Sequence, residues 1–211
     1  MRPALGTVGL SCGRVCVPNK NARTIQVCHA LLDDPKFHSL LLRIDQELAE
    51  HTRAQGCRCG GALHRADYPR KPRGCPRQAR PQYSSRLSFC CAHCRKRSTS
   101  MSVRFLGRRV YLGLAVVLVS PRPAGATPAA ARLGQLLGVC RRTVARWRDW
   151  WHERFPRTPL WRVQCARFMP PVSDAQLPGT LIERFAGPAH EALTRLLLWL
   201  SPVTVRSGEP A

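Results

Sequence analysis

Apolar positions with helical spacing define the first element of the chain. Four of them share one side of a helix: Leu40, Leu41, Ile44 and Leu48. Asp33-Asp34-Pro35 precedes this stretch and Gly56 follows it. Aspartate caps helices, proline suits the first helical turn, and glycine commonly ends a helix. The pattern therefore predicts a helix within residues 33–56.

Two more helices are predicted near the end of the chain, around residues 181–185 and 189–200. Leucines occupy one side of the second helix: Leu193, Leu196, Leu197 and Leu200. Such a side usually faces the protein core, and the alternative is a homodimer interface. We assign residues 176–201 to these C-terminal helices and residues 202–211 to a tail.

A third region predicts two short helices joined by a tight turn. The first covers residues 130–137, and its inward face carries Leu133, Leu136 and Leu137. Gly138 follows, where a left-handed backbone is inexpensive only for glycine, and the second helix begins at Arg141. Its inward face carries Val144, Trp147 and Trp151. This pattern is typical of a helix-turn-helix, whose second helix enters the DNA major groove.

The charge on the outer face of the second helix changes from positive to negative along its length. Its charged stripe consists of Arg142, Arg146, Asp149 and Glu153. Phosphates repel the acidic half, so only the first two turns are expected to approach DNA. The predicted contact residues are Arg141, Arg142, Thr143 and Arg146. Cys140 stands at the cap of this helix, and a thiol is a poor acceptor, so the cap is expected to be weaker by about 1 kcal/mol.

Close pairs of cysteines mark residues 57–106. One pair is Cys57-Arg-Cys59, followed by two glycines, and the other is Cys91 and Cys94, followed by a basic run. Zinc binds four soft ligands, usually as two such pairs from the ends of a loop. The spacing predicts one structural zinc ion on these four thiols. Further candidate ligands are His64, Cys75, Cys90 and His93, and the alternative is reduced, partly buried thiols.

Short strands are predicted around residues 83–89 and 102–106, beside the cysteine pairs. Between the pairs, residues 71–81 are rich in proline and arginine. Such a composition packs poorly, so this insert is expected to be a mobile basic loop. Together with the cysteines, the strands predict a zinc ribbon.

The overall charge narrows the class of partner. The 211 residues include 34 basic and 12 acidic side chains, for a net charge of +22. Nearly all the basic residues are arginines, which bind phosphate and guanine edges through two parallel hydrogen bonds. A nucleic-acid partner is predicted, although a GC-rich coding sequence also raises the arginine content.

The longest apolar run, residues 110–119, is about half the ~20 residues that a membrane helix needs. It predicts a buried element, and no secretory signal is recognised. A cytoplasmic, nucleoid-associated protein with reduced thiols and no membrane partner is expected.

The predicted fold class is mainly α with a small β zinc ribbon, and the ribbon precedes a helical domain. Residues 1–32 are assigned to a flexible leader and residues 33–56 to the N-terminal helix. The zinc-ribbon-like domain covers residues 57–106, and the helix-turn-helix domain covers residues 107–175.

This combination resembles a family of small proteins encoded on bacterial insertion sequences, in which a zinc ribbon precedes a helix-turn-helix. The segments that carry the resemblance are residues 57–74, 89–99, 103–111 and 133–151. The resemblance implies binding to the ends of the element or to a promoter, beside a separate catalytic transposase.

Catalysis is not predicted. Cut-and-paste transposition needs three carboxylates on two metal ions, whereas the acids after Glu153 are few and scattered. The sequence therefore predicts a non-enzymatic, sequence-specific protein that binds double-stranded DNA. The alternatives are a free-standing transcriptional regulator, an inactive remnant of a transposase, and an RNA-binding ribbon protein.

Overall fold

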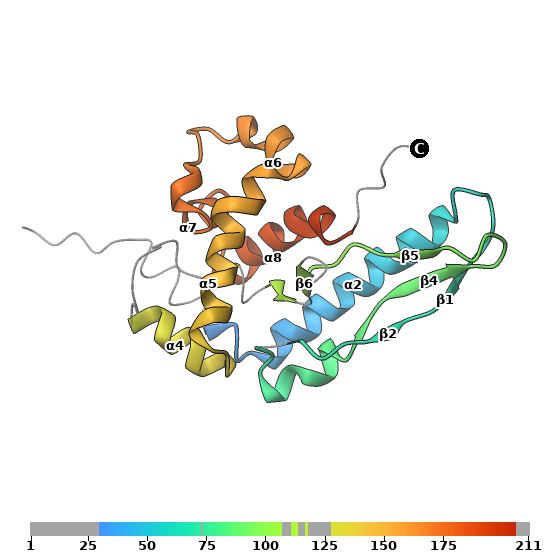
Figure 1. The fold of residues 1–211 in the computed structure, drawn as a ribbon, viewed down its shortest axis with the longest axis horizontal. Helices are drawn as coiled ribbons and strands as arrows, with labels where there is room; N and C mark the ends of the chain where they lie inside the picture. Colours follow the sequence, from blue (N-terminus) through green and yellow to red (C-terminus); the bar gives the residue numbers. More distant parts are fainter. Residues whose placement is uncertain (1–29, 73, 107–110, 114–116, 118–127, 206–211) are drawn as a thin grey trace, which may run out of the picture.

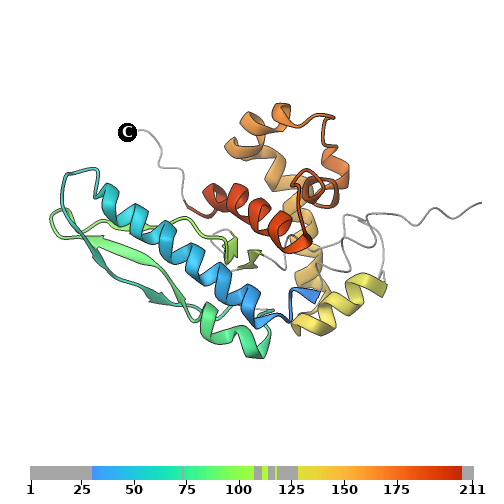
Figure 2. The ribbon, with the colours of Figure 1, turned by 180° about the vertical axis from the view of Figure 1, so that it is seen from behind.

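The computed structural model describes residues 30–72, 74–106, 111–113, 117 and 128–205. Most of the predicted leader and most of the apolar run at residues 110–119 lie outside these ranges. Within them, one end of a small sheet lies at one end of the molecule and helices α4 to α7 lie at the other (Figures 1 and 2). No helix in this part of the chain is long and apolar enough to cross a membrane.

Helix α2 (Pro35–Gln55) is confirmed with both of its predicted ends. The Asp34 side chain accepts a hydrogen bond from the Lys36 amide at 2.9 Å, and Gly56 ends the helix with φ +71°. Its buried side is formed by Phe37, His38, Leu41, Asp45 and Ala49. The predicted apolar face is therefore rotated, because Leu40, Ile44 and Leu48 are only half-buried.

An antiparallel sheet of three strands runs along α2 (Figure 1). Its strand order is β1 (Leu63–Arg65), β4 (Ser88–Cys91) and β5 (Arg97–Thr99). Two shorter pairs join β2 (Tyr68–Pro69) to β3 (Ser85–Arg86) and β6 (Phe105–Leu106) to β7 (Tyr111–Leu112). The sheet packs on Ala49 of α2 through a small core: Leu63, Leu87, Phe89 and Cys91.

The second half of the chain is helical. Its longer elements are α4 (Pro128–Leu137), α5 (Arg141–Asp149), α6 (Pro159–Gln164), α7 (Gly179–Ile182) and α8 (Ala189–Leu200). A π-helical turn, η2 (Trp150–Arg154), extends α5, and short 3-10 turns follow: η3 (Phe155–Arg157), η4 (Cys165–Arg167), η5 (Asp174–Gln176) and η6 (Ser201–Thr204). Both C-terminal helices are therefore confirmed.

Aromatic rings hold the helical half together. Phe155 lies 4.8 Å from Trp151 and 5.2 Å from Trp161, measured between ring centroids. Trp199 of α8 meets the same group, 6.1 Å from Phe155. The predicted leucine side of α8 is buried in this core, with Leu193, Leu196, Leu197 and Leu200 at most 1% exposed. A core role thus explains these leucines without a dimer.

The described part of the insert, residues 71–72 and 74–81, packs against the rest of the chain, so the expectation that it does not pack is wrong. The insert leads into the 3-10 helix η1 (Arg77–Tyr83), in which Ala79 and Tyr83 are fully buried. Gly74 (φ +78°) lies so close to the helical half that an added Cβ would sit 3.2 Å from Val139 Cγ1. The proline and arginine content did not indicate this packing, because the buried apolar surface comes from small residues such as Ala79 and from one tyrosine, Tyr83.

A buried polar cluster joins α2 to the segment between β5 and β6. The Asp45 carboxylate accepts hydrogen bonds from Ser102 Oγ (2.5 Å), the Val103 amide (2.7 Å) and Arg104 Nε (2.7 Å). Nearby, His38 donates from Nε2 to the Leu32 carbonyl (2.8 Å) and accepts at Nδ1 from the Tyr83 hydroxyl (3.0 Å). Burial lowers the pKa of His38, which suits this neutral tautomer.

Candidate metal centre and two-helix surface

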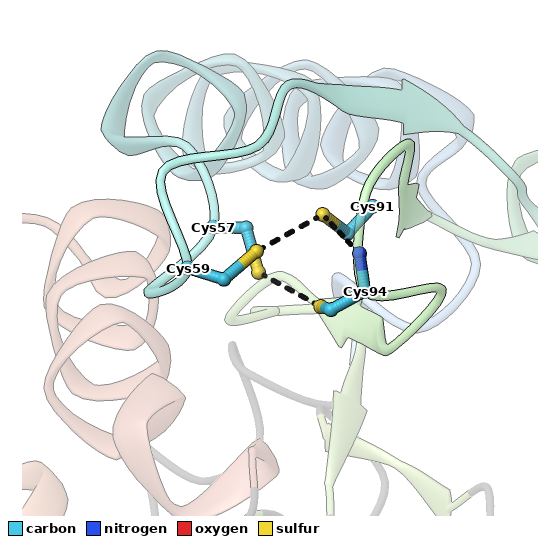
Figure 3. Close-up of side chains that lie close together, drawn as sticks. All are labelled: Cys57, Cys59, Cys91 and Cys94. Carbon is cyan, nitrogen blue, oxygen red and sulfur yellow. Dashed lines mark hydrogen bonds between the residues drawn. The ribbon is translucent and has the colours of Figure 1, made fainter.

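Four cysteines that are distant in sequence meet at the end of the sheet (Figure 3). Their sulfur atoms all lie within 4.8 Å of one another. Cys57 Sγ is 3.5 Å from Cys94 Sγ, and Cys59 Sγ is 3.5 Å from Cys91 Sγ. These are the four predicted metal ligands, so the structure brings together the complete set.

Backbone turns hold each pair of sulfurs in place. After the first pair, the Gly60 amide donates to the Cys57 carbonyl at 2.8 Å, with φ +79° at Gly60. An added Cβ on Gly61 would lie 2.7 Å from Cys91 Sγ, so only glycine fits beside the cluster. This explains physically why two glycines follow the pair and how a spacing with one residue between the cysteines can suffice.

The second pair lies on the turn between β4 and β5. Here the Cys94 amide donates to Cys91 Sγ at 3.4 Å, and Arg95 has φ +58°. An amide directed at a sulfur stabilises its negative charge, as outer hydrogen bonds do for metal ligands. The second turn therefore favours a thiolate at Cys91.

Electrostatics in the cluster favour partial ionisation. The pKa of Cys59 falls to about 6, chiefly because the Gly61 amide donates to it, and the Cys94 amide lowers the pKa of Cys91. The pKa of Cys94 rises despite a favourable Lys96 amide, since its sulfur faces neighbouring sulfurs. A bound cation would remove that penalty and draw off the last protons.

The donor set fits a tetrahedral zinc site. Zinc–sulfur bonds of about 2.3 Å place the sulfurs of a tetrahedron about 3.8 Å apart. The two short sulfur distances of 3.5 Å are close to that value. Four protein ligands leave no open position, which is the arrangement of structural rather than catalytic zinc.

The additional candidate ligands lie outside this cluster. Cys90 pairs with His64 across β1 and β4, and its thiol donates to the Arg95 carbonyl at 3.5 Å. His93 and Cys75 are likewise absent from the group of sulfurs. Burial raises the pKa of Cys75 to about 11, so this thiol stays protonated.

The second predicted feature is the pair α4 and α5. They are separated by Gly138, with φ +59°, and by Val139, whose amide donates to the Gly134 carbonyl at 2.9 Å. The predicted inward side of α5 is buried: Val144, Trp147 and Trp151 are at most 4% exposed. In α4, Leu137 is buried, but Leu136 is 41% exposed, and the side chain of Leu133 lies outside the described set.

The predicted contact residues of α5 differ in accessibility. Arg141 and Arg142 are exposed, and Arg146 is half-buried. Thr143 is only 2% exposed and therefore cannot contact DNA from this position. Cys140 caps α5 without any side-chain hydrogen bond to the backbone, as predicted from its thiol.

Sequence reasoning missed the buried charges. Arg86 of β3 and Arg104 are 5% and 1% exposed, and nothing in the local pattern distinguishes them from surface arginines. Arg86 also lines a hollow beside the four-cysteine cluster. Burial is the main reason that its pKa is lowered.

The described residues define a mainly helical protein with a small antiparallel sheet that carries a four-cysteine cluster able to hold a metal ion. Comparisons with known protein families, with curated proteins and with solved structures found no match. The insertion-sequence resemblance therefore remains a prediction from the motifs.

Proposed function

We propose that this chain is a non-enzymatic, sequence-specific protein that binds double-stranded DNA. In this proposal α4 and α5 act as a helix-turn-helix, and α5 enters the major groove. The observation that carries the proposal is the two-sided character of α5. Arg141 and Arg142 are exposed at its start, while its opposite side is anchored by Val144 and Trp147.

The start of α5 suits an anionic partner for two reasons. The N-terminus of a helix carries partial positive charge, and exposed arginines add full charges there. Asp149 and Glu153 are also exposed, further along the same stripe. Their repulsion of phosphates supports an approach through the first turns only, with Arg142 as the main base contact.

The proposed zinc ion has a structural part in this function. Cys57, Cys59, Cys91 and Cys94 would hold it, and it would join the two ends of the ribbon. A rigid ribbon then presents its basic side chains in fixed positions, where contacts to the DNA backbone add affinity without sequence preference.

The mobile-element setting belongs to the same proposal. The partner DNA would be the ends or promoter of an insertion sequence, and a separate transposase would perform the chemistry. A free-standing transcriptional regulator would use the same residues on another promoter. An inactive remnant of a transposase would have no preferred site.

The test begins with selection of a preferred duplex from a random pool by the zinc-loaded full chain. Arg142→Ala is expected to weaken binding to that duplex by about 1–3 kcal/mol and to lower the preference over random duplex, since a base contact is lost. The measurement is fluorescence anisotropy with both duplexes.

Arg162→Ala is the matched control, because Arg162 is an exposed arginine on α6, away from the start of α5 (Figure 1). It is expected to change both affinities slightly and equally. Equal losses in the two variants would overturn the assigned role of α5. A pool without any enriched sequence would instead favour the remnant.

A further inference from the structure

A basic hollow lies beside the metal centre. Its volume is about 1170 Å³, and its wall includes the first cysteine pair, strands β2, β3 and β5, and the end of the described chain at Val205. Five basic side chains line it: Arg58, Arg70, Arg86, Lys96 and Arg97. Among the residues that the structure describes, no aspartate or glutamate lines it. Concave surfaces with charge of one sign concentrate counter-ions of the opposite sign.

The metal centre neutralises only part of this charge. Four thiolates around one Zn²⁺ carry a net charge of about −2, whereas the five basic side chains of the wall together carry five positive charges. The positive charge of the wall therefore exceeds the negative charge of the loaded cluster. The hollow is therefore a cationic site even when the metal is bound.

Arg86 is the residue that most favours an anionic ligand in the hollow. It is 5% exposed, and its Nη2 donates to the Ser100 carbonyl at 2.6 Å. Its Nη1 is buried and has no hydrogen-bond partner among the described residues. Keeping this guanidinium charged is therefore costly, and an anion bound on the wall of the hollow would lower that cost through its charge.

Arg70 and Arg97 present flat guanidinium groups in the hollow. The guanidinium of Arg70 lies 4.2 Å from the centre of the Tyr68 ring, and that of Arg97 lies 5.2 Å from it. Arg97 is further fixed by donation to the Ala66 carbonyl at 2.6 Å. Ordered guanidinium planes stack on unpaired bases as well as binding phosphates.

The size of the hollow selects among nucleic acids. Its volume of about 1170 Å³ is slightly above the ~300–1,000 Å³ of pockets that hold small ligands. A space of this size suits a few nucleotides of a flexible strand, whose phosphates and bases can contact the wall separately, better than a rigid duplex. Five cations spread over the wall also exceed what one mononucleotide would use.

We propose that this hollow binds single-stranded nucleic acid. The phosphates would lie against Arg86, Lys96 and Arg58, and bases would stack on Arg70 or Arg97. This site is separate from the start of α5, and the inference does not depend on duplex binding by that helix.

The experiment measures binding of a short, fluorescein-labelled oligothymidine to the zinc-loaded full chain at several salt concentrations. Arg70→Glu and Lys96→Glu are each expected to weaken binding about tenfold, and Lys96→Glu, which removes a phosphate contact, is expected to reduce the salt slope by about 0.7. Arg43→Glu is the control, because Arg43 is exposed on α2 and does not line the hollow. It should lower the affinity less than twofold.

Three results would overturn the proposal. The first is equal binding by the hollow variants and Arg43→Glu. The second is competition by a duplex of the same sequence as effectively as by the strand. The third is displacement of the strand by a nucleoside triphosphate at equal phosphate concentration, which would assign a mononucleotide.

Further variants separate this site from misfolding and from the proposed function. Zinc content and circular dichroism identify a variant that fails to fold, and Arg58→Glu then replaces it, since Arg58 is exposed. Arg142→Ala should leave strand binding unchanged. Loss of duplex preference with intact strand binding would therefore reject the role of α5 alone.

Discussion

At the scale of single residues, the ion pair between Asp45 and Arg104 is the most consequential feature. Both side chains are 1% exposed, and Arg104 Nη2 also donates to the Ser85 carbonyl at 3.2 Å while Nη1 donates to the Gln82 carbonyl. The pair thus connects α2 to η1 and β3. Burying two charges is expensive, and the surrounding hydrogen bonds offset that cost.

Asp45→Ala is expected to lower the free energy of unfolding by about 3–5 kcal/mol, because it leaves the Arg104 charge buried without a counter-ion. Chemical denaturation of the zinc-loaded protein measures this change. Glu50→Ala on the same helix is the control. Its carboxylate pairs with Arg53 at 3.5 Å in an exposed position, so a loss below about 1 kcal/mol is expected there. Similar losses in both variants would contradict the role of the buried pair.

Residue chemistry also marks the limit of prediction from the sequence. Asp34, Gly56 and Gly138 were interpretable because their effects are local to a helix end or a turn. Asp45 was not, since its partner lies 59 positions away in the chain and the helix pattern alone makes it a surface acid. Thr143 was misjudged because rotation of a helix by a fraction of a turn decides between exposure and burial.

At the scale of elements, α5 has a weak start. Cys140 has the extended backbone of a cap residue, φ −73° and ψ 158°, but its thiol interacts with the Thr143 hydroxyl at 3.5 Å and makes no capping hydrogen bond to a backbone amide of the helix. The first turn therefore lacks a partner that serine would supply.

Cys140→Ser is expected to raise the free energy of unfolding by about 0.5–1 kcal/mol, since a hydroxyl accepts from the free amides of the first turn. Denaturant titration in matched buffers is the measurement. Cys165→Ser tests for a general effect of removing a thiol, because Cys165 follows the end of α6 rather than preceding a helix. A gain of equal size at both positions would show that capping is not the cause.

The elements with strong local signals were predicted well. Helix α2 had a cap, an apolar face and a terminal glycine, and α8 had four leucines on one side. The prediction that residues 71–81 do not pack failed, because the adjoining helix η1 is stabilised by the contact of Tyr83 with His38, which lies 45 positions earlier. Such tertiary contacts override composition.

At the scale of the molecule, stability is divided unequally between the two ends. The sheet is supported by five buried residues, one of which is the candidate ligand Cys91. The rest of the molecule shares a much larger core that includes Trp147, Trp151 and Phe155. The core under the sheet is so small that it seldom stabilises a fold without a further cross-link such as a bound metal ion.

Purified protein is expected to contain about one zinc ion per chain, and a chelator should remove it. Hydrogen exchange should then show lost protection in β1, β4 and β5, with α5 and α8 still protected. Cys94→Ser should reproduce this loss, whereas Cys90→Ser should keep its zinc, because Cys90 is outside the cluster. Full protection of the sheet after chelation would mean that the thiols have no structural metal.

The close approach of Gly74 to Val139 and Trp147 has a further consequence. This contact packs the half of the molecule with the sheet directly against the turn between α4 and α5. The hollow and the start of α5 are therefore held at a fixed separation and are not joined only by a flexible linker. If both proposed sites bind nucleic acid, binding at one fixes where the other can reach, and the gain from two-point attachment exists only for nucleic acid of matching geometry. Under that condition a junction between duplex and unpaired strand with the right spacing would be bound far more tightly than either part alone, and a change of a few nucleotides in that spacing would abolish the advantage.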